Sequence, residues 1–171
     1  MATDIFDSNV HVKGQLSCKT FVAPVGSIGD QAIESNAGID TEKVIHRHAL
    51  RYNQAPGTAV VAATADLHIL QADGETLSLE AAITGAIATG GDRTVTIDLL
   101  RSTGAGAFAT VLSAPIVLDN TSVLRTPESA TIATPTLVDG DILRLTVAVA
   151  GAAGNQAEGL VVTLTINEDP Q

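Results

Sequence analysis

Two histidines two positions apart, His46 and His48, are the residues whose type and spacing most suggest chemistry in this 171-residue chain. They lie within residues 38–52, GIDTEKVIHRHALRY. In a strand, residues i and i+2 share one face, so both imidazoles could point the same way; in a helix they would lie about 200° apart. Nearby sequence supplies no third or fourth ligand for a structural metal. Three copies of the chain could still complete a metal site at an axis, but we favour structural, metal-free histidines that join two parts of the chain together with Tyr52.

Other residues with catalytic potential are too sparse to form a recognisable active site. Histidine occurs at only two further positions, and the single cysteine, Cys18, has no neighbouring nucleophile motif. The glycine-rich residues 104–106 lead into strand-like sequence, which favours a hairpin turn over a phosphate-binding loop. Asp139 and Asp141 flank a glycine, but the spacing of a calcium-binding loop does not follow. We therefore expect no enzymatic activity, no cofactor and no bound metal.

Charge divides the chain into two unequal parts. Residues 1–55 contain five basic and six acidic residues, a net charge of −1, whereas residues 56–171 contain four arginines and thirteen acidic residues, a net charge of −9. An acidic domain repels nucleic acid and anionic membranes, so neither is expected as a partner. No secretory signal is visible at the N-terminus, and a single cysteine forms no internal disulfide, which fits folding in a reducing cytoplasm.

Apolar residues alternate with polar ones after about residue 58, which predicts β-strands. The clearest runs are residues 76–87, 93–101, 142–150 and 159–168. In the first run, the alternation places Leu77 and Leu79 on the same face. Shorter candidates are residues 58–63, 66–71, 106–113, 115–118 and 129–134. Residues 56–171 are therefore predicted to form an all-β, antiparallel two-sheet sandwich of jelly-roll type, whose strand order the sequence does not determine.

The N-terminal part, residues 1–55, lacks this alternation. It contains three of the four aromatic residues: Phe6, Phe21 and Tyr52. Residues 31–36 and 40–45 could each form one or two helical turns, the second with Asp40 as N-cap, but neither is long enough to fold alone. We therefore expect an extended docking arm that orders against its own domain, a neighbouring copy or a partner surface.

Several segments of the chain resemble a known family. Residues 29–33 (GDQAI) and 36–48 (NAGIDTEKVIHRH) are similar to the N-terminal portion of bacteriophage head-fibre and capsid-decoration proteins. Residues 81–96 (AAITGAIATGGDRTVT) and 147–157 (VAVAGAAGNQA) are similar to phage virion proteins. The resemblance covers most of the chain, and none of its segments carries chemistry.

The resemblance implies a structural virion protein, made in the host cytoplasm and added to the outer surface of an icosahedral head, commonly as a homotrimer. In such proteins the N-terminal part binds the major capsid protein and the β-domain points outward. The candidate capsid-docking residues are then Phe6, Lys13, Lys19 and Phe21. Aromatic anchors supply much of the energy of such contacts, and a nearly neutral arm avoids like-charge repulsion.

A second function stays open, that of a head-fibre or tail adhesin module. Its outer loops, near Gly104, Asn120 and Gly151, would bind a receptor on the host surface. A carbohydrate receptor is disfavoured because such sites usually stack the sugar on an aromatic ring, and residues 56–171 offer only Phe108.

Overall fold

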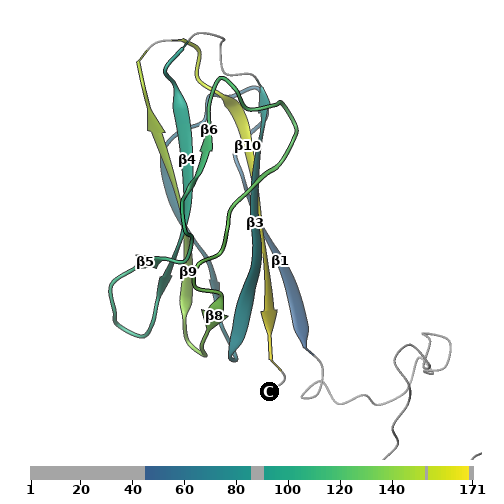
Figure 1. Cartoon of the computed structure of the whole chain (residues 1–171), viewed down its shortest axis with the longest axis vertical. Coiled ribbons are helices and arrows are strands. Elements are labelled where there is room, and N and C mark those ends of the chain that lie inside the picture. The colour runs from purple at the N-terminus through teal and green to yellow at the C-terminus, as the bar shows by residue number, and fades with distance from the viewer. Residues whose placement is uncertain (1–44, 86–90, 153, 170–171) are drawn as a thin grey trace, which may run out of the picture. The chain divides into compact units, whose positions relative to one another are not determined.

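Two antiparallel β-sheets lie face to face with the apolar core between them (Figure 1). The structure, a computed structural model, describes residues 45–85, 91–152 and 154–169. The predicted all-β, antiparallel two-sheet sandwich is confirmed. Most of the predicted arm, residues 1–44 with the expected helical turns, lies outside the described residues.

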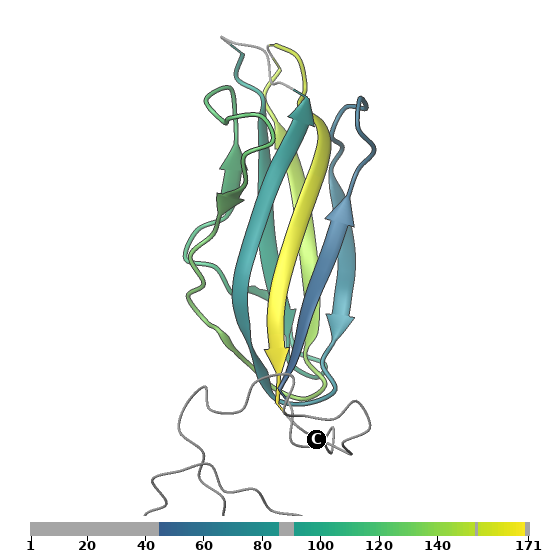
Figure 2. The same ribbon diagram turned by 90° about the vertical axis from the view of Figure 1, so that its right-hand side faces the viewer.

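Sheet A has five strands in the order β1-β10-β3-β7, with β8 also paired to β3. They are β1 (His46–Asn53), β3 (Gly74–Gly85), β7 (Glu128–Ser129), β8 (Thr136–Leu137) and β10 (Glu158–Glu168). Figure 2 looks onto this sheet and shows β3, β10 and β1 side by side. β1 pairs with β10 along its whole length, from His46 opposite Glu168 to Asn53 opposite Val161. The described sandwich therefore includes β1, whereas the predicted division between arm and domain lies after residue 55.

Sheet B has five strands in the order β2-β9-β4-β5, with β6 also paired to β4. They are β2 (Ala63–Ile69), β4 (Thr94–Ser102), β5 (Ala109–Thr110), β6 (Ile116–Leu118) and β9 (Ile142–Ala150). The four clearest runs of alternation correspond to β3, β4, β9 and β10. The candidate at 66–71 corresponds to β2, which begins three residues earlier and ends two residues earlier than predicted. Residues 106–113, 115–118 and 129–134 form shorter strands than predicted, and residues 58–63 contribute only an isolated bridge between Ala59 and Glu158 before β2 begins.

The core is built from aliphatic side chains that alternate inward from both sheets. Fully buried examples are Leu79, Ile83, Val95, Ile97, Leu99, Leu143, Leu145, Leu160, Leu164 and Ile166. Branched residues pack well on a pleated surface, and burying each of these side chains stabilises the fold by roughly 1.5–3 kcal/mol. The long strands β3, β4, β9 and β10 thus hold the sandwich together, and the short strands β5 to β8 complete one edge of each sheet.

A β-bulge in β3 changes which side chains face the core. Thr165 of β10 pairs with Ser78, and the next residue, Ile166, pairs with Thr76, so Leu77 is an extra residue on β3. An inserted residue shifts the alternation by one position. Thr76 is consequently buried, at 2% exposure, and Leu77 is only half-buried, contrary to the prediction that Leu77 shares the buried face of Leu79. The bulge also turns Glu75 outward.

Candidate functional site

The carboxylate of Glu168 lies between two histidines at one end of the sandwich. His48 Nε2 lies 2.8 Å from Glu168 Oε2, and His68 Nε2 lies 3.3 Å from Oε1. The backbone N–H of Gln71 donates a hydrogen bond of 2.8 Å to Oε1. The Glu168 side chain is only 7% exposed, so these contacts replace most of its hydration. We call His46, His48, His68 and Glu168 the histidine–glutamate cluster.

Three strands from both sheets position this cluster. His46 and His48 lie on β1, Glu168 on β10 in the same sheet, and His68 on β2 in the opposite sheet. Because alternate residues of a strand share a face, the rings of His46 and His48 stack, with centroids 6.5 Å apart and planes at 16°. The His48 and His68 rings lie 5.4 Å apart at 36°. The cluster thus connects the edge strands of the two sheets.

The surroundings of Glu168 favour its charged form. Burial raises its pKa, but the hydrogen bonds from Gln71 and His68, and the electrostatic attraction to the rings of His68 and His48 when they are protonated, outweigh burial and hold the pKa below its usual value. His48 is close to the carboxylate without being aligned for a hydrogen bond, so its contribution is mainly that of its charge. The carboxylate can therefore act as the counter-ion of either imidazole.

This arrangement suits a structural role, that of holding three strands together. It fixes the start of β1, the first strand of the described chain, to β10 within sheet A and to β2 across the core. Among residues 45–85, 91–152 and 154–169, no three or more histidine, cysteine, aspartate or glutamate side chains are grouped to hold a metal ion. An ion shared by several copies of the chain remains a separate hypothesis.

The structure describes three of the predicted site residues, and all three lie on β1. His46 and His48 belong to the cluster, whereas Tyr52 lies at the other end of the strand, where its hydroxyl accepts a 3.1 Å hydrogen bond from Gln54 Nε2. Gln54 also bonds to the backbone N–H and carbonyl of Val61, each at 2.8 Å. The four predicted capsid-docking residues lie outside the described part of the chain: Phe6, Lys13, Lys19 and Phe21.

Sequence reasoning missed two members of the cluster, His68 and Glu168, which are separated by 100 positions. One signal was present in the last predicted strand. Its alternation through Leu164 and Ile166 places Glu168 on the inward face, and a carboxylate at a buried position needs a partner. The identity of that partner depends on the pairing of β1 with β10, which the sequence did not predict.

Elsewhere the described surface has open depressions. One of about 230 Å³ is lined by Arg101, Thr110 and neighbouring residues, and another of about 300 Å³ by Ile45, Glu75 and Asn167 among others.

In the described part of the chain, no helix is long and apolar enough to cross a membrane. Comparisons of the chain with protein-family models, with curated proteins and with solved structures find no match.

Proposed function

We propose that this chain is a structural virion protein that decorates the outside of a bacteriophage head. In this proposal the N-terminal arm binds neighbouring major capsid proteins and cements them, while the β-sandwich faces outward as part of a homotrimer. The resemblance of residues 29–48 and 81–96 to head-fibre and capsid-decoration proteins is the main support from the sequence. A protein that binds the assembled shell stabilises that shell by mass action, and several linked contacts raise its avidity.

The structural observation that carries the proposal is the anchoring of β1. Residues 1–44 lead directly into this strand, which is hydrogen-bonded to β10 over eight residues and clasped by the cluster at His48 and Glu168. A mechanical force on an arm bound to the capsid would be transmitted along the chain to the sandwich through β1, because β1 follows the arm in sequence. A cement protein needs such a firm connection because it has to resist movement between the capsid subunits that it links.

We infer that the sandwich is of jelly-roll type, and the strand orders support this. The chain alternates between the sheets from β1 to β4, keeps β5 and β6 in sheet B, returns to sheet A for β7 and β8, and crosses twice more for β9 and β10. The order β1-β10-β3-β7 thus lies against β2-β9-β4-β5. This is the order expected when two Greek keys share one sandwich. Jelly rolls are frequent among viral capsid domains and lectins, so the fold is compatible with a virion protein without identifying one.

The second candidate function is a head-fibre or tail adhesin. It is favoured by the position of two of its candidate receptor-binding loops, which lie at the end of the sandwich opposite the start of β1. In sheet B, Thr94 pairs with Ala150 at one end and Ser102 pairs with Ile142 at the other. The loop after Ala150, with Gly151, therefore lies at the end opposite His46, and so does the loop after β6, with Asn120 (Figure 1). The loop with Gly104 follows Ser102 and therefore lies at the same end of the sandwich as His46. A module held at one end could bind a receptor at the other.

One binding comparison separates the two functions. The full-length protein is incubated with purified empty heads of the phage and, in parallel, with host cells, and bound protein is measured after sedimentation. Decoration predicts saturable binding to heads and no binding to cells. Binding to cells without binding to heads would overturn the decoration proposal in favour of the adhesin.

A further inference from the structure

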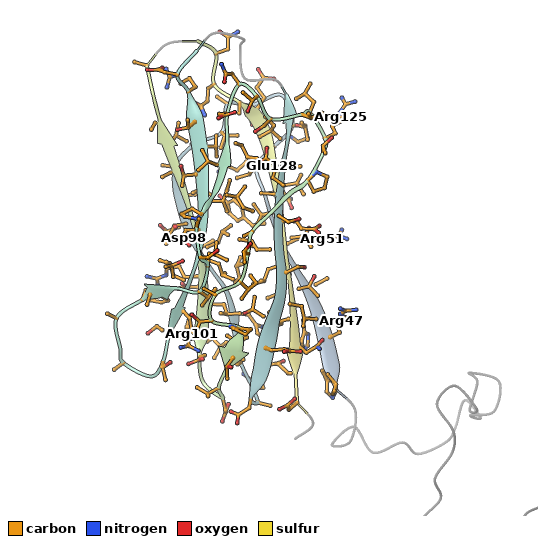
Figure 3. The ribbon with its side chains drawn as sticks, viewed as in Figure 1. Arg47, Arg51, Asp98, Arg101, Arg125 and Glu128 are labelled. Atoms are coloured by element: carbon orange, nitrogen blue, oxygen red, sulfur yellow. The ribbon has the colours of Figure 1, made fainter. Side chains whose placement is uncertain are left out.

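The outer face of sheet A carries an ordered pattern of charge. On β1, Arg47 and Arg51 are exposed and alternate with inward residues such as His48. Figure 3 shows both arginines projecting away from the sandwich on this side. On β3, Glu75 and Glu80 are exposed and point outward from the same face, since their neighbours Thr76 and Leu79 are buried. Of these two strands, β1 therefore carries the positive charge on this face and β3 the negative charge.

The strand register places these charges at matching heights. Arg47 is opposite Asn167 on β10, which is opposite Glu75 on β3. Arg51 is opposite Thr163, which is opposite Glu80. Because adjacent strands are about 4.8 Å apart, each arginine is separated from its glutamate by about 10 Å of sheet. The bulge at Leu77 is necessary for this match, because it turns Glu75 outward at the height of Arg47.

Two arginines elsewhere in the described chain pair with acids, whereas Arg93 and Arg125, like Arg47 and Arg51, form no ion pair there. Arg144 bonds to Asp66 through two nitrogens at 2.6 and 3.0 Å, and Arg101 Nε lies 3.7 Å from the buried Asp141. Arg47 and Arg51 form no ion pair with any residue that the structure describes. Charges on an edge strand can simply prevent unwanted strand pairing. That role does not require acids at the same heights two strands away.

A rotation axis outside sheet A and parallel to β10 would bring opposite sides of this face together. Such a rotation keeps every residue at its height along the strands and brings the β1 side of one copy against the β3 side of the next. Arg47 then faces Glu75 of the next copy, and Arg51 faces Glu80. A two-fold axis in the plane of the face and perpendicular to the strands would instead bring arginine against arginine. The charge pattern is therefore self-complementary when copies are related by an axis parallel to the strands, and not when the axis is perpendicular to them.

We propose that the outer face of sheet A binds further copies of this chain around a rotation axis parallel to β10. The strip of β10 that would face the axis is suitable because its outward residues Val161, Thr163 and Thr165 are short, and Val161 is 38% exposed. Opposite charges set the orientation, and burial of the strip adds affinity. The number of copies rests on the proposed function, which gives three.

The arrangement has a consequence for the histidines. His46 and His48 lie on the inward side of β1, whereas Arg47 and Arg51 lie on the outward side. The imidazoles would therefore point away from the axis, and three copies would not bring them together. The hypothesis of a metal shared at the axis is incompatible with this interface.

Charge exchange in the full-length chain tests the interface. The variants are Arg47→Glu/Arg51→Glu, Glu75→Arg/Glu80→Arg and the combination of all four substitutions, and light scattering gives the mass at micromolar concentration. The wild type is expected at about three times the 17.4 kDa chain mass. Each double variant places like charges together and is expected at the mass of one chain, while the fourfold variant restores the wild-type mass.

Two controls keep the outcome interpretable. Thr64→Glu/Thr96→Glu adds acids to the outer face of sheet B and should leave the mass unchanged. Circular dichroism checks folding, and if a charge-reversed variant fails to fold, Arg47→Gln/Arg51→Gln should still weaken assembly. A monomeric wild type, or double variants with the wild-type mass, would overturn the inference. A wild-type dimer with the same response to the variants would support this surface and contradict the homotrimer, and binding to heads is measured independently of both.

Discussion

Glu168 is the buried carboxylate that contacts two histidines of the cluster and the backbone of Gln71. A buried carboxylate is unfavourable unless hydrogen bonds or opposite charges replace its hydration. Here the amide of Gln71 and the rings of His48 and His68 do so from two different sheets. The cluster therefore stabilises the fold only while all of its members are present, because removal of one leaves the others buried without a partner.

Glu168→Gln tests the stabilising role of the charge. Glutamine keeps the shape of the side chain but loses the negative charge, so the free energy of unfolding at pH 7 should fall by roughly 1–3 kcal/mol. Urea denaturation followed by circular dichroism measures the change. Glu158→Gln, at an exposed position, is the matched control and should have little effect. Equal effects of the two substitutions would show that the cluster does not stabilise the sandwich.

The pH dependence of the same pair of proteins follows from the lowered pKa of Glu168. A group whose pKa is lower in the folded than in the unfolded state stabilises the fold above its unfolded pKa, about 4.3 for glutamate. That stability is lost as the pH falls through the lower, folded pKa. The difference in unfolding free energy between wild type and Glu168→Gln should therefore shrink as the pH falls below about 5. A difference that grows on acidification would contradict this assignment.

Metal content is the third test at this scale. We predict that His46 and His48 hold no metal, since His48 already contacts Glu168 and the described residues offer no group of ligands. Elemental analysis of protein purified without a histidine tag should find less than one zinc, nickel or iron per three chains. A stoichiometric metal that survives dialysis would instead favour a site shared between copies.

Among the elements, the long strands could be predicted from sequence because aliphatic residues fill their inward positions. β1 could not, because its inward positions include His46, His48 and Tyr52, which hide the alternation. The bulge at Leu77 could not either, since the local sequence reads equally well without an inserted residue. Two of the four cluster members, His46 and His48, were singled out by their spacing. Glu168 joins them only because β1 and β10, the first and last strands of the described chain, pair with each other.

The turn that follows β9 offers a test of backbone geometry. Gly151 has a φ of 82°, and a Cβ there would overlap the carbonyl oxygen of Asp92. Gly140, before β9, has a φ of 79° and open space around its Cβ position. Gly140→Ala should cost about 1–2 kcal/mol for the left-handed conformation alone, and Gly151→Ala clearly more, because the backbone has to move as well. Urea denaturation compares them, and equal losses would show that the turn at Gly151 has room to adjust.

Different surfaces of the whole molecule are proposed to bind different partners. The predicted arm, residues 1–55, contains every lysine of the chain and is proposed to bind the capsid. The outer face of sheet A is proposed to bind other copies, and under the alternative adhesin proposal the loops with Asn120 and Gly151 would bind the host surface. The net charge of −9 on residues 56–171 makes that part of the chain a poor ligand for an acidic partner, which is the reason that docking is proposed for the arm.

The arm is tested most directly by removing residues 1–36 and measuring binding to expanded heads by co-sedimentation, with the full-length protein alongside. The truncated chain keeps all of β1, so its circular dichroism spectrum should still be that of a β-sandwich. In the full-length chain, Phe6→Ala and Phe21→Ala should each weaken head binding by about 1–3 kcal/mol if they anchor the contact. The account predicts a folded truncated protein that no longer binds heads. A truncated protein that decorates heads with undiminished affinity would contradict it and assign the docking surface to the sandwich.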